Sequence, residues 1–255
     1  GAVVDSTCRS VSPGAFLCVR EGKSIDFADT VSLFSRAVAA GLFGIRPQMP
    51  DGTVTVSPAL PDEWEHAGIR LPDFSCDCRW DGSTQTVTIC SAKPCRKILR
   101  LPARRSRIEA VSADGQDVPW ETEAGIGEPY IRICTESGTR HTVQIRYGGE
   151  PLHPPEYPST VAAGEPFELL THGYPIAELR DPQGIVAGRS LQADGNLSVR
   201  PAGLAGWHTF FLRLMVGKLS FWSPVNLRVT KGPAVREPAF DAARRAVSFR
   251  LENSR

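Results

Sequence analysis

The sequence has no long hydrophobic run and no excess of charge of one sign. It contains 29 Lys and Arg against 28 Asp and Glu, for a net charge of +1. A balanced charge gives no electrostatic footprint for nucleic acid or an anionic membrane. No apolar run approaches the roughly 20 residues of a membrane-spanning helix, and no signal peptide is recognisable. We therefore expect neither a nucleic-acid nor a membrane partner. The abrupt opening at Gly1 leads us to expect a piece of a longer protein.

The cysteines lack the spacing of a metal site. Among the 7 cysteines there is no C-x-x-C pair, and no His pair stands at zinc-ligand spacing. Cys76 and Cys78 would share one face of an extended strand, and Cys90 and Cys95 flank a predicted turn at Pro94. We favour buried free thiols over a metal site and leave open a disulfide in one pair. No metal and no cofactor is indicated.

Helical pattern is confined to one segment near the start. Ser24 can cap a helix that runs to Ala40, and Gly41 is expected to end it. Its apolar residues recur at steps of three and four and define one face. They are Ile25, Phe27, Ala28, Val31, Phe34 and Val38. Such a face must pack on something, so we expect it to meet a sheet of this chain or helices outside it.

Short alternating segments dominate the rest of the chain. "TVTVSP", "STQTVTIC", "KILRLP", "YIRIC" and "HTVQIRY" alternate with period two between Gly, Pro and Asp turn signals. About seven further short strands follow between Tyr157 and Lys231, with core candidates that include Phe167, Phe211 and Phe221. The predicted fold is therefore mainly β, an antiparallel β-sandwich with one N-terminal helix, followed by an Ig-like β-sandwich without a Cys-Trp-Cys signature.

The predicted organisation has four parts. Residues 1-44 form a terminal helix segment, 45-149 an antiparallel β-sandwich, 150-231 an Ig-like β-sandwich, and 232-255 a linker with an added strand or the start of a further β unit. A Pro-rich stretch, "GGEPLHPPEYPS", supports the boundary between the two sandwiches.

The cluster "PALPDEWEHAG" holds the first candidate site. Asp62, Glu63 and Glu65 flank Trp64, and paired carboxylates beside an aromatic ring suit glycoside cleavage. However, neighbouring carboxylates on one chain point in different directions. The favoured alternative is a capped turn with Trp64 packed on the helix layer.

Histidines and tryptophans give weaker signals. The five histidines, His66 and His141 among them, show no catalytic or metal-binding order. Trp80, Trp207 and Trp222, with Trp120, would make a sugar-binding platform if they shared an exposed sheet face. The favoured alternative is that these rings are core or corner residues.

One run carries a resemblance to a known family. Asp26–Trp64, "DFADTVSLFSRAVAAGLFGIRPQMPDGTVTVSPALPDEW", resembles the exit of an (α/α)6-barrel glycoside hydrolase, where the last barrel helix leads through "GLFGI-P", "DG", a strand and a "P-LP-W" turn. "FSCDCRWDGSTQTVTIC" resembles the β-sandwich that follows the barrel. "AGWHTFFLRL" and "FWSPVNLRV" are similar to the Ig-like part of a poorly characterised branch, a domain of unknown function.

The resemblance implies carbohydrate processing in the periplasm or outside the cell. It also implies that the helices bearing the general acid and base precede this chain, so no catalytic residue is assigned. Asp62, Glu63, Trp64 and His66 would line the rim of an active site completed by that barrel, and Trp80 would extend the substrate surface. The expected partners are a polysaccharide or oligosaccharide and the helical barrel of the same protein.

Three hypotheses follow. The first is a non-catalytic accessory or scaffold region of a carbohydrate-active enzyme. The second is a stand-alone carbohydrate-binding or adhesion module of Ig-like type, and the third is a spacer. An exposed aromatic row on a sheet face would favour the second, and a bare apolar patch along Phe34 and Val38 would favour the first.

Overall fold

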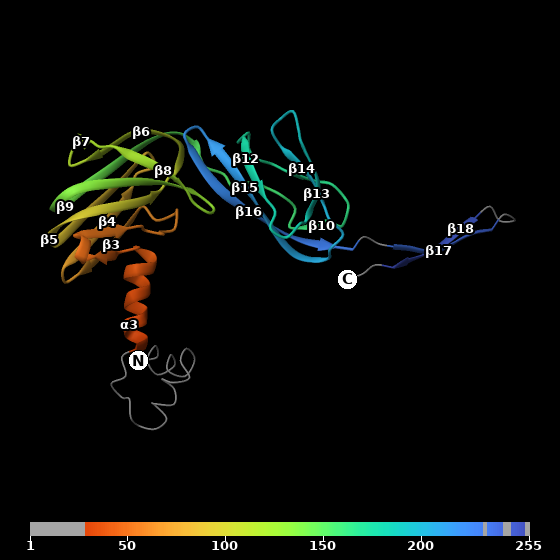
Figure 1. Ribbon diagram of the computed structural model, residues 1–255, viewed down its shortest axis with the longest axis horizontal. Coiled ribbons are helices and arrows are strands. Elements are labelled where there is room, and N and C mark those ends of the chain that lie inside the picture. Colours follow the sequence, from red (N-terminus) through yellow and green to blue (C-terminus); the bar gives the residue numbers. More distant parts are fainter. Residues whose placement is uncertain (1–28, 232–233, 242–245, 253–255) are drawn as a thin grey trace, which may run out of the picture. The chain divides into compact units, whose positions relative to one another are not determined.

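The computed structural model describes residues 29–231, 234–241 and 246–252. The protein is mainly β, with one short helix near the start, an antiparallel β-sandwich and then an Ig-like β-sandwich (Figure 1). It divides into two compact units. The first is Gly1–Pro102, Ile108–Glu121 and Ile131–Gly148; the second is Ala103–Arg107, Thr122–Tyr130 and Gly149–Arg255. No helix in the described part of the chain is long and apolar enough to cross a membrane.

The helix differs from its prediction at its C-terminal end. Helix α3 (Asp29–Arg36) continues as a wider π-helical turn, η1 (Ala37–Leu42), so Gly41 does not end it. The Phe43 N–H donates to Val38 O over 3.1 Å, the five-residue spacing of a π-turn. The left-handed residue that follows is Gly44, with φ of 60°. Residues 24–28 of the predicted helix lie outside the described part.

A nine-stranded sheet forms the first sandwich and follows the path β1-β2-β5-β9-β6-β7, with β3, β4 and β8 joined at its sides. The pairings of β1 with β2, β3 with β4, β4 with β5 and β6 with β7 are antiparallel, and the pairing of β2 with β5 is parallel. The strands are β1 (Arg46–Gln48), β2 (Thr53–Val56), β3 (His66–Leu71), β4 (Phe74–Trp80), β5 (Thr84–Pro102), β6 (Arg105–Ala113), β7 (Gln116–Asp117), β8 (Trp120–Ala124) and β9 (Pro129–Pro151).

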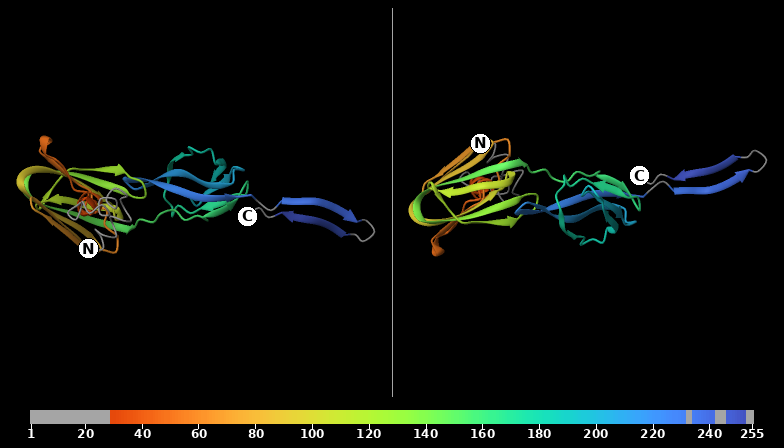
Figure 2. Two further views of the ribbon diagram at one scale, coloured as in Figure 1. Left: turned by 90° about the horizontal axis from the view of Figure 1, so that it is seen from below. Right: turned by 90° about the horizontal axis from the view of Figure 1, so that it is seen from above.

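Two strands are much longer than predicted. "STQTVTIC" and "KILRLP" belong to one strand, β5, and "YIRIC" and "HTVQIRY" to another, β9. The first half of β5 pairs with β4 and the second half with β2, so the strand changes partner near Pro94 instead of ending in a turn. Figure 2 shows both long strands curving round one end of the first unit. They therefore belong to both layers of the sandwich.

Strand alternation fills the core of the first unit. Val87, Ile89, Leu99 and Leu101 of β5 are fully buried, as are alternate residues of β9. Cys76 and Cys78 share a buried face of β4 as predicted, with their sulfur atoms 3.7 Å apart. A hydrogen bond with Cys78, and then burial, raise the pKa of the Cys76 thiol. All cysteines of the described part are free thiols, Cys90 and Cys95 included.

The second unit has the strand order of an Ig-like fold. One sheet runs β10-β16-β15-β12 and the other β11-β14-β13, with β10 parallel to β16. The strands are β10 (Thr160–Ala162), β11 (Phe167–Leu169), β12 (Ile176–Arg180), β13 (Val186–Leu191), β14 (Leu197–Pro201), β15 (Gly206–Val216) and β16 (Leu219–Thr230). The last described strands, β17 (Ala234–Asp241) and β18 (Ala246–Glu252), pair as a hairpin.

Apolar side chains replace the antibody disulfide in this unit. Leu169 of β11 and Leu212 of β15 are fully buried on the inner faces. The register corrects one predicted core residue: Phe210 points inward with no exposure, and Phe211 points to the outer face and is half-buried. Because two phenylalanines are adjacent, the sequence did not show which of them faces the core. The register between β15 and β16 places Phe210 opposite Val225, on the buried side.

Candidate functional site

The predicted rim residues lie at the surface between β2 and β3. Asp62 and Glu63 are exposed, and Trp64 is 46% exposed, so Trp64 does not pack fully on a helix layer. The Trp64 N–H donates to Pro61 O over 3.1 Å, which closes a tight turn. The turn puts these residues in solvent. Their role at the rim of a substrate site stays a prediction.

His66 belongs to a different group of side chains. Its Nε2 lies 2.7 Å from Asp77 Oδ2, and Arg79 Nε donates to Asp77 Oδ1 over 3.0 Å. The hydrogen bond from His66, followed by that from Arg79, lowers the pKa of Asp77. These three side chains satisfy one another across β3 and β4, and the ring of His66 is held by Asp77 rather than by Asp62 or Glu63.

Trp80 is anchored in the sandwich. Its ring meets the Tyr147 ring edge-on at a centroid distance of 5.7 Å, and Tyr147 is buried. The Tyr147 hydroxyl donates to Gln85 Oε1 over 3.0 Å. The backbone N–H of Trp80 donates to Glu65 O over 2.8 Å, which brings the half-buried Trp80 next to the predicted rim.

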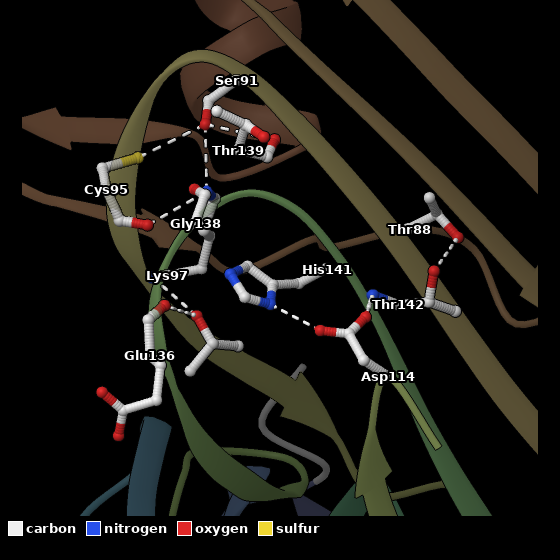
Figure 3. Close-up of polar contacts among 11 residues, drawn as sticks. Thr88, Ser91, Cys95, Lys97, Asp114, Glu136, Gly138, Thr139, His141 and Thr142 are labelled. Atoms are coloured by element: carbon white, nitrogen blue, oxygen red, sulfur yellow. Dashed lines mark hydrogen bonds and ion pairs between the residues drawn. The ribbon is translucent and has the colours of Figure 1, made fainter. Parts of the chain in front are cut away.

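A buried polar cluster that the sequence did not indicate lies where β5 and β9 bend (Figure 3). Lys97 has no exposed surface, and its Nζ donates to Ser91 Oγ over 2.9 Å, to Cys95 O over 3.0 Å and to Gly138 O. Ser91 in turn donates to Lys93 O over 2.9 Å. The available signal was the alternation of the strand, which puts Lys97 on the same buried face as Leu99 and Leu101.

A serine beside a lysine raises the question of nucleophilic catalysis. A catalytic lysine must be neutral to take the serine proton. Here Nζ donates to three oxygen acceptors, one of which is Ser91 Oγ. The Ser91 hydroxyl donates its own proton to Lys93 O and not to Nζ. The arrangement fits a structural cross-link between the two bends and does not fit a general base.

His141 extends this cluster toward the β6–β7 turn. Its Nδ1 lies 2.8 Å from Asp114 Oδ2, while its buried Nε2 has no hydrogen-bond partner among the described residues. Burial disfavours ionisation of Asp114, but hydrogen bonds from the Thr142 N–H and from His141 outweigh it and lower the Asp114 pKa. A Cβ on Gly138 would lie 2.6 Å from His141 Nε2, so any other residue there would require the buried His141 ring to shift.

An apolar groove of about 710 Å³ opens beside the cluster in the first unit. Asp73, Ser91, Lys93 and Cys95 contribute to its lining, and the remaining lining is apolar. Its apolar residues are Ala39, Ile45, Pro47, Met49, Val54, Leu71, Pro72, Phe74 and Ala92. Met49 is 48% exposed and Leu71 38% exposed. Its volume is in the range of ligand pockets, but it offers few polar groups to orient a small molecule.

The helix that precedes this groove in the chain exposes apolar side chains, and Ala39 of η1 lines the groove. Leu33 and Phe34 of α3 are 56% and 65% exposed, and Val38 is half-buried. The predicted face residues Phe27 and Val31 lie outside the described side chains. An apolar helix surface beside an apolar groove is typical of an interaction surface.

Within residues 29–231 and the two short ranges that follow, no group of three or more His, Cys, Asp or Glu side chains could hold a metal ion.

Comparisons with known proteins identify no family. No family model matches the chain, and no curated protein matches it. Among solved structures, the crystal structure of Down Syndrome Cell Adhesion Molecule (DSCAM) isoform 1.30.30, N-terminal eight Ig domains, is similar at 10% identity and a TM-score of 0.23. The match covers 69% of this chain and 26% of that chain. The Ig-like assignment therefore rests on the strand order of the second unit.

Proposed function

We propose that this chain is a non-catalytic scaffold of a glycoside hydrolase-like protein, and that its first unit packs against a helical domain. The observation that carries the proposal is the bare apolar surface formed by α3 and the adjoining groove. We name this surface the docking face and define it by Leu33, Phe34, Met49 and Leu71.

The chemistry of the docking face favours a helical partner. Leu33 and Phe34 project from a helix of eight residues, which is too short to be stable in water by itself. A helix of this kind gains stability when its apolar side chains enter the grooves of neighbouring helices. The resemblance of Asp26–Trp64 to a barrel exit supports the same partner, because that segment includes α3 and leads directly into the first sandwich.

The polar groups of the first unit support a role without catalysis. The Ser91–Lys97 pair is held as a cross-link, and the His66–Asp77 pair is an exposed hydrogen-bonded pair. Under this proposal the sugar-cleaving groups come from the helical partner. Asp62, Glu63 and Trp64 would then lie at the rim of its active site.

The test is association between separately expressed parts. This chain would be mixed with the helical domain that the proposal places before it, and complex formation would be measured by light scattering after gel filtration. We expect a complex that Phe34→Glu weakens at least tenfold, because a charge would be buried against apolar helices. Ser35→Glu, one residue away on the same helix, is the matched control and should leave binding unchanged.

Three results would contradict the proposal. One is no complex with the wild-type chain, and another is equal binding by Phe34→Glu and the control. The third is that Phe34→Glu lowers the melting temperature of the isolated chain by several degrees, which would show that its own residues already cover the docking face. A dimer of this chain that Phe34→Glu dissociates would assign the face to a second copy instead.

A further inference from the structure

The outer face of the sheet β12–β15–β16 carries aromatic rings. Alternation along β15 and β16 puts Trp207, Phe211 and Trp222 on this face, opposite the buried side of the sheet. Trp207 is 69% exposed, and Phe211 and Trp222 are half-buried. The exposed aromatic row expected of a carbohydrate-binding sheet is therefore present in the second unit. Trp80 and Trp120 are not part of it.

A hollow of about 590 Å³ lies on this face. Its lining consists of Ile126, Arg180, Asp181, Pro182, Phe211 and Trp222, all within the second unit. Ile126 pairs with Trp222 as an isolated bridge, closed by the Gly127 N–H bonded to Trp222 O over 2.7 Å. Ile126 is 71% exposed. The volume suits one or two sugar-sized rings.

Arg180 is fixed at the edge of the hollow. Its guanidinium carbon lies 4.5 Å from the centre of the Trp222 ring, and its Nε donates to Glu178 Oε1 over 2.6 Å. Its two terminal nitrogens have no hydrogen-bond partner in the part of the chain that the structure describes. A guanidinium held in this way presents a planar pair of donors, which matches the two oxygens of a carboxylate.

The neighbouring acidic side chains do not use those donors. Both oxygens of Asp181 accept backbone N–H groups, from Ile185 over 3.0 Å and from Val186 over 2.8 Å. Glu178 is bound to Arg180 Nε. Arg213 and Arg228 lie on the same outer face, so the face has three arginines against two carboxylates. An anionic ligand complements this charge.

The face extends beyond the hollow along β15. Trp207 and Phe211 are four residues apart on one strand, about 13 Å at the usual rise per residue. Between them the Thr209 hydroxyl donates to Asn226 Oδ1 over 2.7 Å, which leaves the Asn226 amide nitrogen as a donor. Rings separated by polar groups suit a ligand that repeats the same alternation, as a saccharide chain does with its apolar ring faces and its hydroxyls.

We propose that this arginine–tryptophan face (Arg180, Trp207, Phe211, Asn226 and Trp222) binds an acidic saccharide. Arg180 holds the carboxylate of one uronic-acid ring in the hollow, where the ring packs on Phe211. A further ring of the same chain stacks on Trp207. The argument uses only the second unit and does not depend on the scaffold role of the first.

Calorimetric titration of the full chain tests the site. The probes are dimers and hexamers of galacturonic and glucuronic acid, with neutral galactose oligomers for comparison. We expect binding of an acidic hexamer that weakens with added salt, and at least tenfold weaker binding by Arg180→Ala. Arg200→Ala is the matched control, because Arg200 is an exposed arginine of the same unit in the other sheet. Trp207→Ala should weaken the hexamer and leave the dimer unchanged.

Several outcomes would overturn the site. They are no binding of either acidic hexamer, equal binding of the neutral oligomers, and equal affinity for wild type and Arg180→Ala. Equal weakening by Arg200→Ala would show a general charge effect. If Arg180→Ala does not fold, Arg180→Lys keeps the charge without the planar donors and should still weaken binding several-fold. Phe34→Glu should leave saccharide binding unchanged, so this proposal and the scaffold proposal fail separately.

Discussion

Lys97 shows how one residue stabilises the bends of the long strands. Where β5 and β9 curve, Cys95 O and Gly138 O accept hydrogen bonds from Lys97 Nζ. Lys97→Met would retain most of the volume but leave these buried acceptors without a donor. We expect the free energy of unfolding to fall by about 3 kcal/mol, measured by urea denaturation. Lys93→Met, at an exposed lysine four residues away, should change it by less than about 0.5 kcal/mol.

The structural role assigned to Lys97 also has a chemical test. A serine-directed fluorophosphonate should not label the wild-type chain at Ser91, because the Ser91 hydroxyl accepts from Lys97 Nζ and donates to Lys93 O. Labelling of Ser91 that Lys97→Met abolishes, with no loss of stability, would contradict the cross-link and favour a nucleophile.

Asp114 is expected to make the free energy of unfolding of the first unit decrease at acidic pH. Its pKa is lowered in the folded protein, so its ionised form contributes stability that is present above the unfolded pKa and lost as pH falls through the folded pKa. Asp114→Asn keeps an acceptor for His141 and tolerates the positive φ of 52° at this turn. We expect the variant to be less stable than wild type at pH 7 and the difference to shrink below about pH 4. A difference that stays constant down to pH 2 would contradict this account.

At the scale of elements, Gly44 sets how the helical segment leads into β2. It has φ of 60°, and a Cβ there would lie 2.0 Å from Ser57 O. Gly52 has a similar φ of 63°, but a Cβ at that position would meet nothing within 4 Å, which makes it a matched control. We expect Gly52→Ala to cost about 1 kcal/mol through backbone strain. Gly44→Ala should cost at least about twice as much. Equal melting temperatures for the two variants would show that the chain adjusts freely at Gly44.

Sequence alternation predicted the fold class and most of the inward-facing residues, because a period of two is a local property. It did not predict that β5 and β9 pass through their bends without ending. Pro94 and Gly138 are turn signals locally, yet pairing with other strands and the hydrogen bonds of Lys97 keep the backbone extended there. The same limit explains Phe211, whose face depends on a register that only β16 fixes. The polar clusters join residues far apart in sequence, such as Asp114 and His141, and no local pattern signals them.

At the scale of the whole molecule, the two units present different surfaces. The first carries apolar side chains on α3 and its groove, and the second carries arginines and aromatic rings on one sheet. An apolar surface fits a folded protein domain, whereas a charged aromatic surface fits a hydrated polymer. Under the two proposals, the first unit holds a helical domain and the second unit binds a saccharide.

The most direct test of the scaffold role is to measure reducing-sugar release from plant and microbial polysaccharides. The chain alone would be compared with the chain combined with the helical domain that the scaffold proposal places before it. The account predicts no release by the chain alone and release by the combination, with Glu63→Gln altering the combined activity if Glu63 lies at the rim. Release by this chain alone would contradict the scaffold role.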